Sequence, residues 1–271
     1  MTPVAALLAM KDSAPSLHDV VGPWLRQHGS GIHDREALVV LFDSCHWMDY
    51  RADANLVLSA PERERALRFR QDRHRDAYVM AHAVWRLVLA EVLGVVPDDV
   101  PLANTTNGQP RLPGTGYATS LSHSGNGVAI AIARAGCIGI DIEPSQPRTG
   151  MGDLIKVVCT PDEASALSRL EPSLRDAAML ALWTRKEALL KAFGVGLLAT
   201  PSTIGVAIGV AIPPPAQACE MPACVVHPLT LPEGWMGALA APAPISALRV
   251  LALPMRSTDV VMHASEVRPV M

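Results

Sequence analysis

The sequence has few aromatic side chains and few charges. Aromatic residues make up 4% of the 271 residues and charged residues 18%, whereas hydrophobic residues make up 49%. An intrinsically disordered protein needs the opposite balance, low hydrophobicity with high net charge. The net charge of −3 also gives no overall positive field that would hold nucleic acid. We therefore expect a folded protein of one or two domains without a nucleic-acid partner.

Cysteine is scarce as well, and its spacing excludes two common uses. The five cysteines are odd in number and scattered, and no His/Cys pair completes a zinc pattern. This usage predicts reduced thiols in a cytoplasmic protein rather than a disulfide framework. The cysteines are Cys45, Cys137, Cys159, Cys219 and Cys224.

No segment of the sequence has the pattern of a membrane span or an export signal. The longest apolar stretch, residues 236–255, is interrupted by Arg249 and by three prolines, Pro242, Pro244 and Pro254. These residues favour two buried strands joined by an Ala-Pro-Ala-Pro turn. The first ten residues lack a basic region and are followed at once by Lys11. We therefore expect neither a membrane anchor nor a secretory signal.

Two segments, residues 59–94 and 159–194, resemble each other at an offset of one hundred. The second opens on the capping box Thr160-Pro-Asp-Glu163, and Ser59-Ala-Pro-Glu62 has the same spacing. Each start leads to a second, apolar helix that ends near a glycine, Gly94 or Gly194, and Arg86 is aligned with Lys186. The pattern predicts two similar halves.

Strand patterns follow each helical pair, so we expect an α+β fold of two similar halves, each a small antiparallel sheet packed with helices. The predicted divisions are an N-terminal extension (1–35), an N-terminal half (36–135), a C-terminal half that carries the metal ligands (136–255) and a C-terminal tail (256–271). Neither the extension nor the tail has periodicity. Two halves in one chain make a monomer the simple expectation.

The strand Gly139-Ile-Asp-Ile-Glu-Pro144 carries two carboxylates. Side chains alternate along a strand, so Asp141 and Glu143 share one face while Ile140 and Ile142 point to the core. Like charges at this spacing need a compensating cation, and hard oxygen ligands suit Mg²⁺. The alternative is a solvated edge strand.

A second charged group lies on the helix that begins near residue 178. Trp183, Glu187 and Lys191 follow at intervals of four and form one stripe. Glu187 and Lys191 could be only a surface pair, but a carboxylate beside a lysine can ligate metal or take a proton and can neutralise phosphate.

Two further features carry weaker signals. Ser122-His123-Ser124 opens a strand, where a lone histidine is most often an ordinary polar residue. The six arginines between residues 63 and 75 are either a solvated helix face or an anion site.

Together, these motifs resemble the signature of the 4′-phosphopantetheinyl transferases. The matching residues are Gly139-Ile-Asp-Ile-Glu143 followed by Trp183-x-x-Lys186-Glu187-x-x-x-Lys191-x-x-Gly194. The segments around Arg68-Phe69, Ala81-His82, Gly108-x-Pro110 and Ser122-His123-Ser124 resemble the surfactin-synthetase type of that family, which has two halves of similar fold in one chain. The resemblance covers roughly residues 37–253.

The resemblance implies a reaction. The phosphopantetheine arm of coenzyme A moves to a serine of an apo carrier protein, an acyl or peptidyl carrier of fatty-acid, polyketide or nonribosomal-peptide synthesis, and leaves 3′,5′-ADP. Mapped by motif, Asp141, Glu143 and Glu187 would hold Mg²⁺, or Mn²⁺, at the pyrophosphate. Glu187 would also be the general base and Lys191 would assist the leaving group. The coenzyme A contacts would be Lys186 and Lys191 near phosphate, Ser122, and His123 with Arg63 at the 3′-phosphate.

Two departures from the family pattern stand out. Gln109 replaces the lysine of the common Gly-Lys-Pro, which removes one cation near the phosphates, and the arginine run aligns ambiguously after Arg63, so that Arg65 is a further candidate. A binding module without catalysis and a Mg²⁺-dependent pyrophosphate hydrolase are therefore kept as rival functions.

Overall fold

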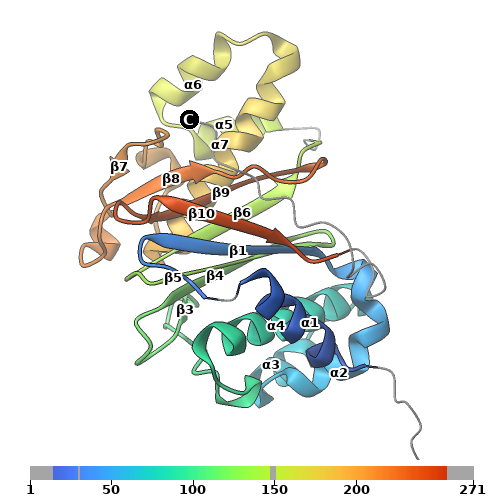
Figure 1. The fold of residues 1–271 in the computed structure, drawn as a ribbon. Helices are drawn as coiled ribbons and strands as arrows, with labels where there is room; N and C mark the ends of the chain where they lie inside the picture. Colours follow the sequence, from blue (N-terminus) through green and yellow to red (C-terminus); the bar gives the residue numbers. More distant parts are fainter. Residues whose placement is uncertain (1–14, 30, 147–150, 255–271) are drawn as a thin grey trace, which may run out of the picture.

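A computed structural model of the chain describes residues 15–29, 31–146 and 151–254. The predicted tail, residues 256–271, and the first part of the predicted extension lie outside these residues. Figure 1 shows two sheets in the middle of the molecule with helices on both outer sides. The α+β class predicted from the sequence is confirmed.

The first sheet has the strand order β10-β1-β5-β4, and the second has the order β6-β9-β8-β7. Neighbouring strands are antiparallel except for β1 and β10, which run parallel. In chain order the strands of the two sheets are β1 (Glu36–Asp43), β4 (Ala118–Ser124), β5 (Gly127–Ala133), β6 (Gly139–Pro144), β7 (Ala211–Ile212), β8 (Cys224–Pro228), β9 (Trp235–Pro242) and β10 (Ala247–Ala252). A separate small hairpin pairs β2 (Ala103–Asn104) with β3 (Pro110–Arg111).

The helices form two groups, one on each outer side of the sheets (Figure 1). The first group is α1 (Leu17–His28), α2 (Arg51–Val57), α3 (Ala60–Leu67) and α4 (Asp72–Leu93). The second group is α5 (Met151–Val158), α6 (Pro161–Ser168) and α7 (Pro172–Phe193). Among the described residues, no helix is long and apolar enough to cross a membrane.

The repeat predicted from the sequence is present in the structure. The long helices α4 and α7 have 22 residues each, and both end at a glycine in the left-handed conformation, Gly94 and Gly194. Both preceding helices, α3 and α6, begin with a capping box. The caps, Ser59 and Thr160, are offset by 101 residues rather than 100, because proline is the second residue of α3 but the first of α6.

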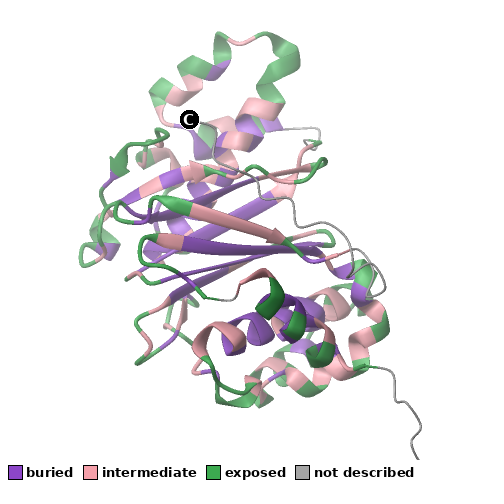
Figure 2. Cartoon of the chain, in the orientation of Figure 1, coloured by how far each residue is buried: buried purple, intermediate pink, exposed green. Residues whose placement is uncertain are grey.

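Apolar residues fill three layers, which Figure 2 shows as buried segments on the inner sides of helices and strands. Helices α1–α4 cover one face of the first sheet, and α7 covers the outer face of the second. Between the sheets, small alanines of β5 pack against larger isoleucines of β6. The alanine-rich composition therefore lets two sheets come close together. These inner residues are Ala129, Ala131, Ala133, Ile140 and Ile142.

Gly139 allows α7 to lie directly on β6. A Cβ atom at this position would overlap the backbone of α7 at Ala188 and Ala192. Only a residue without a side chain permits this approach. The close contact brings the acidic strand next to the helix that carries Glu187 and Lys191.

The apolar stretch 236–255 forms two strands, β9 and β10, as predicted. However, β10 leaves the second sheet and pairs with β1 in the first. Its Arg249 forms an ion pair with Glu36 and donates hydrogen bonds to the carbonyls of His28, Gly29 and Gly31. The chain therefore crosses twice between the sheets, and the predicted division into halves stays a prediction.

The N-terminal extension is not without structure, which corrects the sequence interpretation for residues 15–35. Ser16 and Asp19 form a capping box, and α1 packs on α4 through Val21 and Leu25. Its Arg26 forms an ion pair with Glu91 of α4. The sequence reading missed this helix because its capping acid is Asp rather than Glu or Gln and a proline lies inside it.

Candidate active site

A cavity of about 760 Å³ lies where residues of the first helical group and β4 meet the end of α7. Its walls carry several titratable groups, whereas a second cavity of about 540 Å³ is mostly apolar. Pockets that combine size with convergent polar groups are the usual sites of binding and catalysis. We therefore take the first cavity as the candidate site. Its lining includes Arg65, Arg68, His82, Gln109, His123 and Lys191.

The centre of the site is a contact between three residues from three elements. Asp141 of β6 is only 6% exposed, and its Oδ1 accepts hydrogen bonds from Ser122 Oγ of β4 (2.9 Å) and from Lys191 Nζ of α7 (2.7 Å). Lys191 Nζ also lies 3.0 Å from Ser122 Oγ. Three of the predicted site residues are thus brought together, although they lie up to 69 positions apart in the chain.

Alternate serines of β4 join the two sheets along this line. Ser120 Oγ accepts a hydrogen bond from the N–H of Ile140 (3.2 Å), and Ser122 Oγ accepts one from the N–H of Ile142 (3.3 Å). Ser124 Oγ donates to the carboxylate of Glu143. Alternation along β4 puts all three hydroxyls on one face. They supply the partners that the edge of β6 would otherwise lack.

Glu187 lies one turn of α7 before Lys191 and is half-buried. Burial raises the pKa of its carboxyl, the negative charges of Asp141 and Glu143 raise it further, and Lys191 opposes them. The structure therefore places three carboxylates close enough to repel one another, against one lysine. A cation bound among these carboxylates would relieve their repulsion.

One carboxylate oxygen of this group lacks a hydrogen-bond partner among the described residues. This oxygen, Asp141 Oδ2, is buried. A buried carboxylate oxygen without a partner is costly, and a hard divalent cation is the ligand that suits it. The ligand atoms of Asp141, Glu143 and Glu187 do not all lie within 4.8 Å of one another. The donor set fits Mg²⁺ or Mn²⁺, and binding would draw the carboxylates together.

Gln109 connects the turn before β3 to the end of α7. Its side-chain N–H groups donate to the carbonyls of Lys191 (3.1 Å) and Ala192 (2.9 Å). Its amide also packs on Gly194, where a Cβ atom would overlap it. Carbonyls at a helix C-terminus have no partner within the helix. The residue that departs from the family pattern therefore satisfies the end of α7 and supports the backbone of Lys191.

His123 lines the cavity beside other cationic groups. Desolvation of its ring lowers its pKa, and repulsion from His82 and Lys191 lowers it further. An anion bound nearby would reverse this effect by stabilising the charged imidazole. A bound anion would therefore raise the pKa of His123 and would be stabilised by its charged ring.

Some arginines of the run between residues 63 and 75 line the cavity, and others do not. Arg63, predicted to contact coenzyme A, is exposed, donates to the carbonyl of Leu58 and does not line the cavity. Arg65 and Arg68, three positions apart on one helix face, do line it. Arg65 also lies over the Tyr78 ring, 5.8 Å from its centre. The three-residue spacing of Arg65 and Arg68 is the sequence signal that could have indicated which arginines face the cavity.

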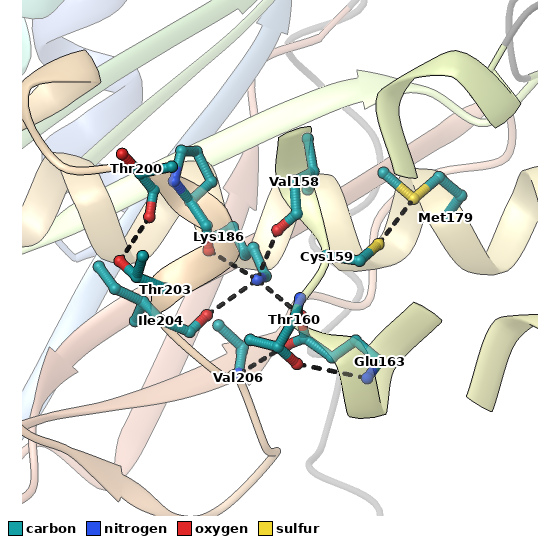
Figure 3. A network of polar contacts seen from close by, with 11 residues as sticks. Val158, Cys159, Thr160, Glu163, Met179, Lys186, Thr200, Thr203, Ile204 and Val206 are labelled. Atoms are coloured by element: carbon teal, nitrogen blue, oxygen red, sulfur yellow. Dashed lines mark hydrogen bonds and ion pairs between the residues drawn. The ribbon is translucent and has the colours of Figure 1, made fainter. Parts of the chain in front are cut away.

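Lys186 is not at the cavity, and this placement corrects the phosphate contact expected for it. Its ammonium is 1% exposed and lies 2.6 Å from a Glu163 oxygen, among the carbonyls of Val158, Pro201 and Ile204 (Figure 3). The first half has the same arrangement, because Arg86 of α4 pairs with Glu62 of the α3 capping box. Each long helix is thus tied to the preceding helix by a buried ion pair.

The hydrogen bonds around Glu62, the partner of Arg86, lower the pKa of its carboxyl. Burial raises the pKa of Glu62, but hydrogen bonds from His82, Ser59 and Arg86 outweigh it and hold the pKa at about 2. Its stabilising effect is therefore present above the ordinary carboxyl pKa and is lost as the pH falls towards 2. Arg86 and Lys186 occupy equivalent structural positions, as the sequence alignment of the two segments suggested.

The α+β fold, with three carboxylates and Lys191 brought together by β6 and α7, can now be compared with known proteins. Residues 137–218 match the model of the 4′-phosphopantetheinyl transferase superfamily. The chain is 33% identical over 149 residues to the 4′-phosphopantetheinyl transferase HetI of Nostoc sp.. The aligned segment covers 54% of this chain and 63% of that protein. The chain is 31% identical over 143 residues to a 4′-phosphopantetheinyl transferase of Bacillus subtilis, covering 52% and 62%.

A further relative is a phosphopantetheinyl transferase of Thraustochytrium sp., 32% identical over 164 residues, which covers 54% of this chain and 55% of that protein. The match therefore spans less than two thirds of these relatives. The matched segment holds Asp141, Glu143, Glu187 and Lys191. Residues 137–218, which include the acidic strand and α7, are thus similar to the 4′-phosphopantetheinyl transferase superfamily.

Removing the charge of Glu163 tests the structural role of Lys186. In Glu163→Gln the capping box is kept, because Gln also serves at that position, but the buried ammonium loses its anion. We expect the free energy of unfolding at pH 7, measured by urea denaturation, to fall by about 3 kcal/mol. Glu64→Gln is the matched control: its exposed pair with Arg68 should change the value by less than about 0.5 kcal/mol. Equal effects of the two changes would contradict the role.

Proposed function

We propose that the protein transfers the 4′-phosphopantetheine arm of coenzyme A to a serine of an apo carrier protein and releases 3′,5′-ADP. The observation that carries the proposal is the contact of Asp141, Lys191 and Ser122 at the edge of a large polar cavity. The superfamily match over the acidic strand and α7 supports it. We further propose the surfactin-synthetase type, because two similar halves lie in one chain.

The cavity provides separate places for the anionic groups of coenzyme A. Arg65, Arg68 and His123 line the cavity, and we assign them to the 3′-phosphate end. Lys191 lies beside the carboxylates and is assigned to the pyrophosphate. In phosphoryl transfer, catalysis depends mainly on positioning and on cationic groups that stabilise the negative charge of the transition state.

Asp141, Glu143 and Glu187 would hold Mg²⁺, with Mn²⁺ as a substitute. When bound, the cation supplies charge neutralisation and orientation at the pyrophosphate. The orphan Oδ2 of Asp141 and the raised pKa of Glu187 support this assignment. In the structure, Lys191 provides part of the same compensation through Asp141 Oδ1.

The chemistry assigned to the protein is proton transfer and positioning. The serine oxygen of the carrier forms a bond to the phosphorus that bears the pantetheine, and the bond from that phosphorus to the bridging oxygen breaks. Glu187 accepts the serine proton, directly or through water, and its raised pKa brings it closer to the value that suits a general base near neutral pH. Lys191 stabilises the charge that forms on the leaving 3′,5′-ADP.

The proposed partners are acyl or peptidyl carrier proteins of fatty-acid, polyketide or nonribosomal-peptide synthesis. We propose a cytoplasmic monomer, in line with the two halves in one chain. The rival functions predict different products. A binding module would hold coenzyme A without transfer, and a pyrophosphate hydrolase would release free phosphopantetheine without a carrier.

The direct test is incubation with coenzyme A, Mg²⁺ and a panel of apo acyl and peptidyl carriers, read by mass spectrometry. We expect a phosphopantetheine adduct on the serine of at least one carrier, and loss of activity with a chelator. Glu187→Gln should lower the transfer rate by about a hundredfold or more, because it removes the proton acceptor and a metal ligand. No adduct on any carrier, with a folded protein, would overturn the proposal.

The choice between arginines is tested by coenzyme A affinity. Arg65→Ala should weaken binding about tenfold, the effect of losing one charge-assisted contact, because this side chain lines the cavity. Arg63→Ala, two positions away and facing out, is the matched control and should leave the affinity within about twofold. Calorimetry measures both. A larger loss of coenzyme A affinity in Arg63→Ala than in Arg65→Ala would contradict the assignment of Arg65 to the 3′-phosphate.

A further inference from the structure

A second group of chemically reactive side chains lies at the end of β1, outside the lining of the candidate active site. Asp43, Cys45 and His46 each offer one ligand atom, and these three atoms lie within 4.8 Å of one another. Among the described residues, this is the one group of three or more His, Cys, Asp or Glu side chains that meets that limit. The proposed reaction uses none of the three.

The backbone that carries the group is held in place on both sides. Ser44 donates from its N–H (2.8 Å) and from its Oγ (3.0 Å) to the carbonyl of Asn126 in the turn between β4 and β5. Trp47 follows, and it is 1% exposed in the core of the first half. Inward-facing residues therefore flank and anchor the ligand-bearing ones, so binding would not require ordering of a loose loop.

The local geometry brings the side chains to one side. The segment Ser44–Tyr50 is a 3₁₀ helix (η1) with Asp43 as its N-cap, and side chains three positions apart eclipse in such a helix. Asp43 therefore lies over His46. The carboxylate of Asp43 also accepts the N–H of Cys45 (2.9 Å), which fixes its direction.

The side chains of Asp43 and Cys45 meet directly. Their ligand atoms, the Asp43 carboxylate oxygen and Cys45 Sγ, lie within 4.8 Å of each other. A cation bound between them would displace the thiol proton of Cys45. Cys45 and His46 are exposed, so a metal ion can reach them, and no hydrogen bond within the described residues uses the His46 ring.

We propose that Asp43, Cys45 and His46 form a binding site for a borderline-soft divalent cation, with Zn²⁺ as its occupant. Thiolate, imidazole and carboxylate are all ligands of zinc, and three protein ligands leave the fourth tetrahedral position open to water or an outside ligand. The mixed donor set separates this site from the all-carboxylate group at Asp141, which suits a hard cation such as Mg²⁺. Each site therefore selects its own class of metal.

The test is titration of the full chain with Zn²⁺ by calorimetry, in excess Mg²⁺ to fill the carboxylate site. We expect saturable binding of one equivalent. With Co²⁺ as a spectroscopic substitute, a sulfur-to-cobalt charge-transfer band should appear. Cys45→Ser should abolish the band and weaken Zn²⁺ binding by at least about tenfold, and His46→Ala should weaken it similarly.

Two matched variants make the outcome decisive. Cys219→Ser removes the other exposed cysteine and should change neither the band nor the affinity. Glu187→Gln alters the carboxylate group and should leave Zn²⁺ binding intact. Absence of saturable binding, binding that survives Cys45→Ser, or binding lost in Glu187→Gln would each overturn the proposal. The readouts do not use phosphopantetheine transfer, so the site and the proposed function can fail separately.

Discussion

The ion pair between Lys191 and Asp141, joined by Ser122, is the contact on which the arrangement of the site depends. It links α7, β6 and β4, three elements that otherwise belong to different parts of the chain. Burying the Asp141 carboxylate without a partner would cost several kcal/mol. The lysine offsets this cost on one oxygen only, and the other oxygen stays unpartnered. The same interaction thus links the two sheets and keeps a partly compensated negative group buried beside Lys191, which lines the cavity.

The internal repeat explains how one fold supplies both stability and chemistry. Arg86 and Lys186, aligned at an offset of one hundred, each anchor a long helix to the preceding capping box. The positions that follow have diverged: Glu187 corresponds to Leu87, and Lys191 corresponds to Glu91. In the first half these positions are used for the core and for the ion pair with Arg26 of α1. Of the two copies, the second therefore places a carboxylate and a lysine beside Asp141.

The sequence was sufficient for the features that depend on local patterns. The capping boxes of α3 and α6, the helix-ending glycines, the two strands of residues 236–255 and the shared face of Asp141 and Glu143 all follow from spacing along the chain. Contacts between distant segments were not accessible in this way. Lys186 directly precedes Glu187 in the sequence, but its ammonium is buried and pairs with Glu163. Gln109 has its hydrogen-bond partners 82 and 83 positions away. The choice of Arg65 over Arg63 depends on how α3 packs against α4, because Arg65 lies over the Tyr78 ring of α4.

The most direct test of this description is a crystal structure with Mn²⁺ and coenzyme A, in which anomalous scattering locates the cation. We expect one Mn²⁺ ion ligated by Asp141 Oδ2, Glu143 and Glu187, with the pyrophosphate bound to it beside Lys191. The adenosine end should extend along the wall formed by Arg65, Arg68 and His123. A cation held elsewhere, or a pyrophosphate that does not reach Lys191, would contradict the assignment of the catalytic centre to this junction.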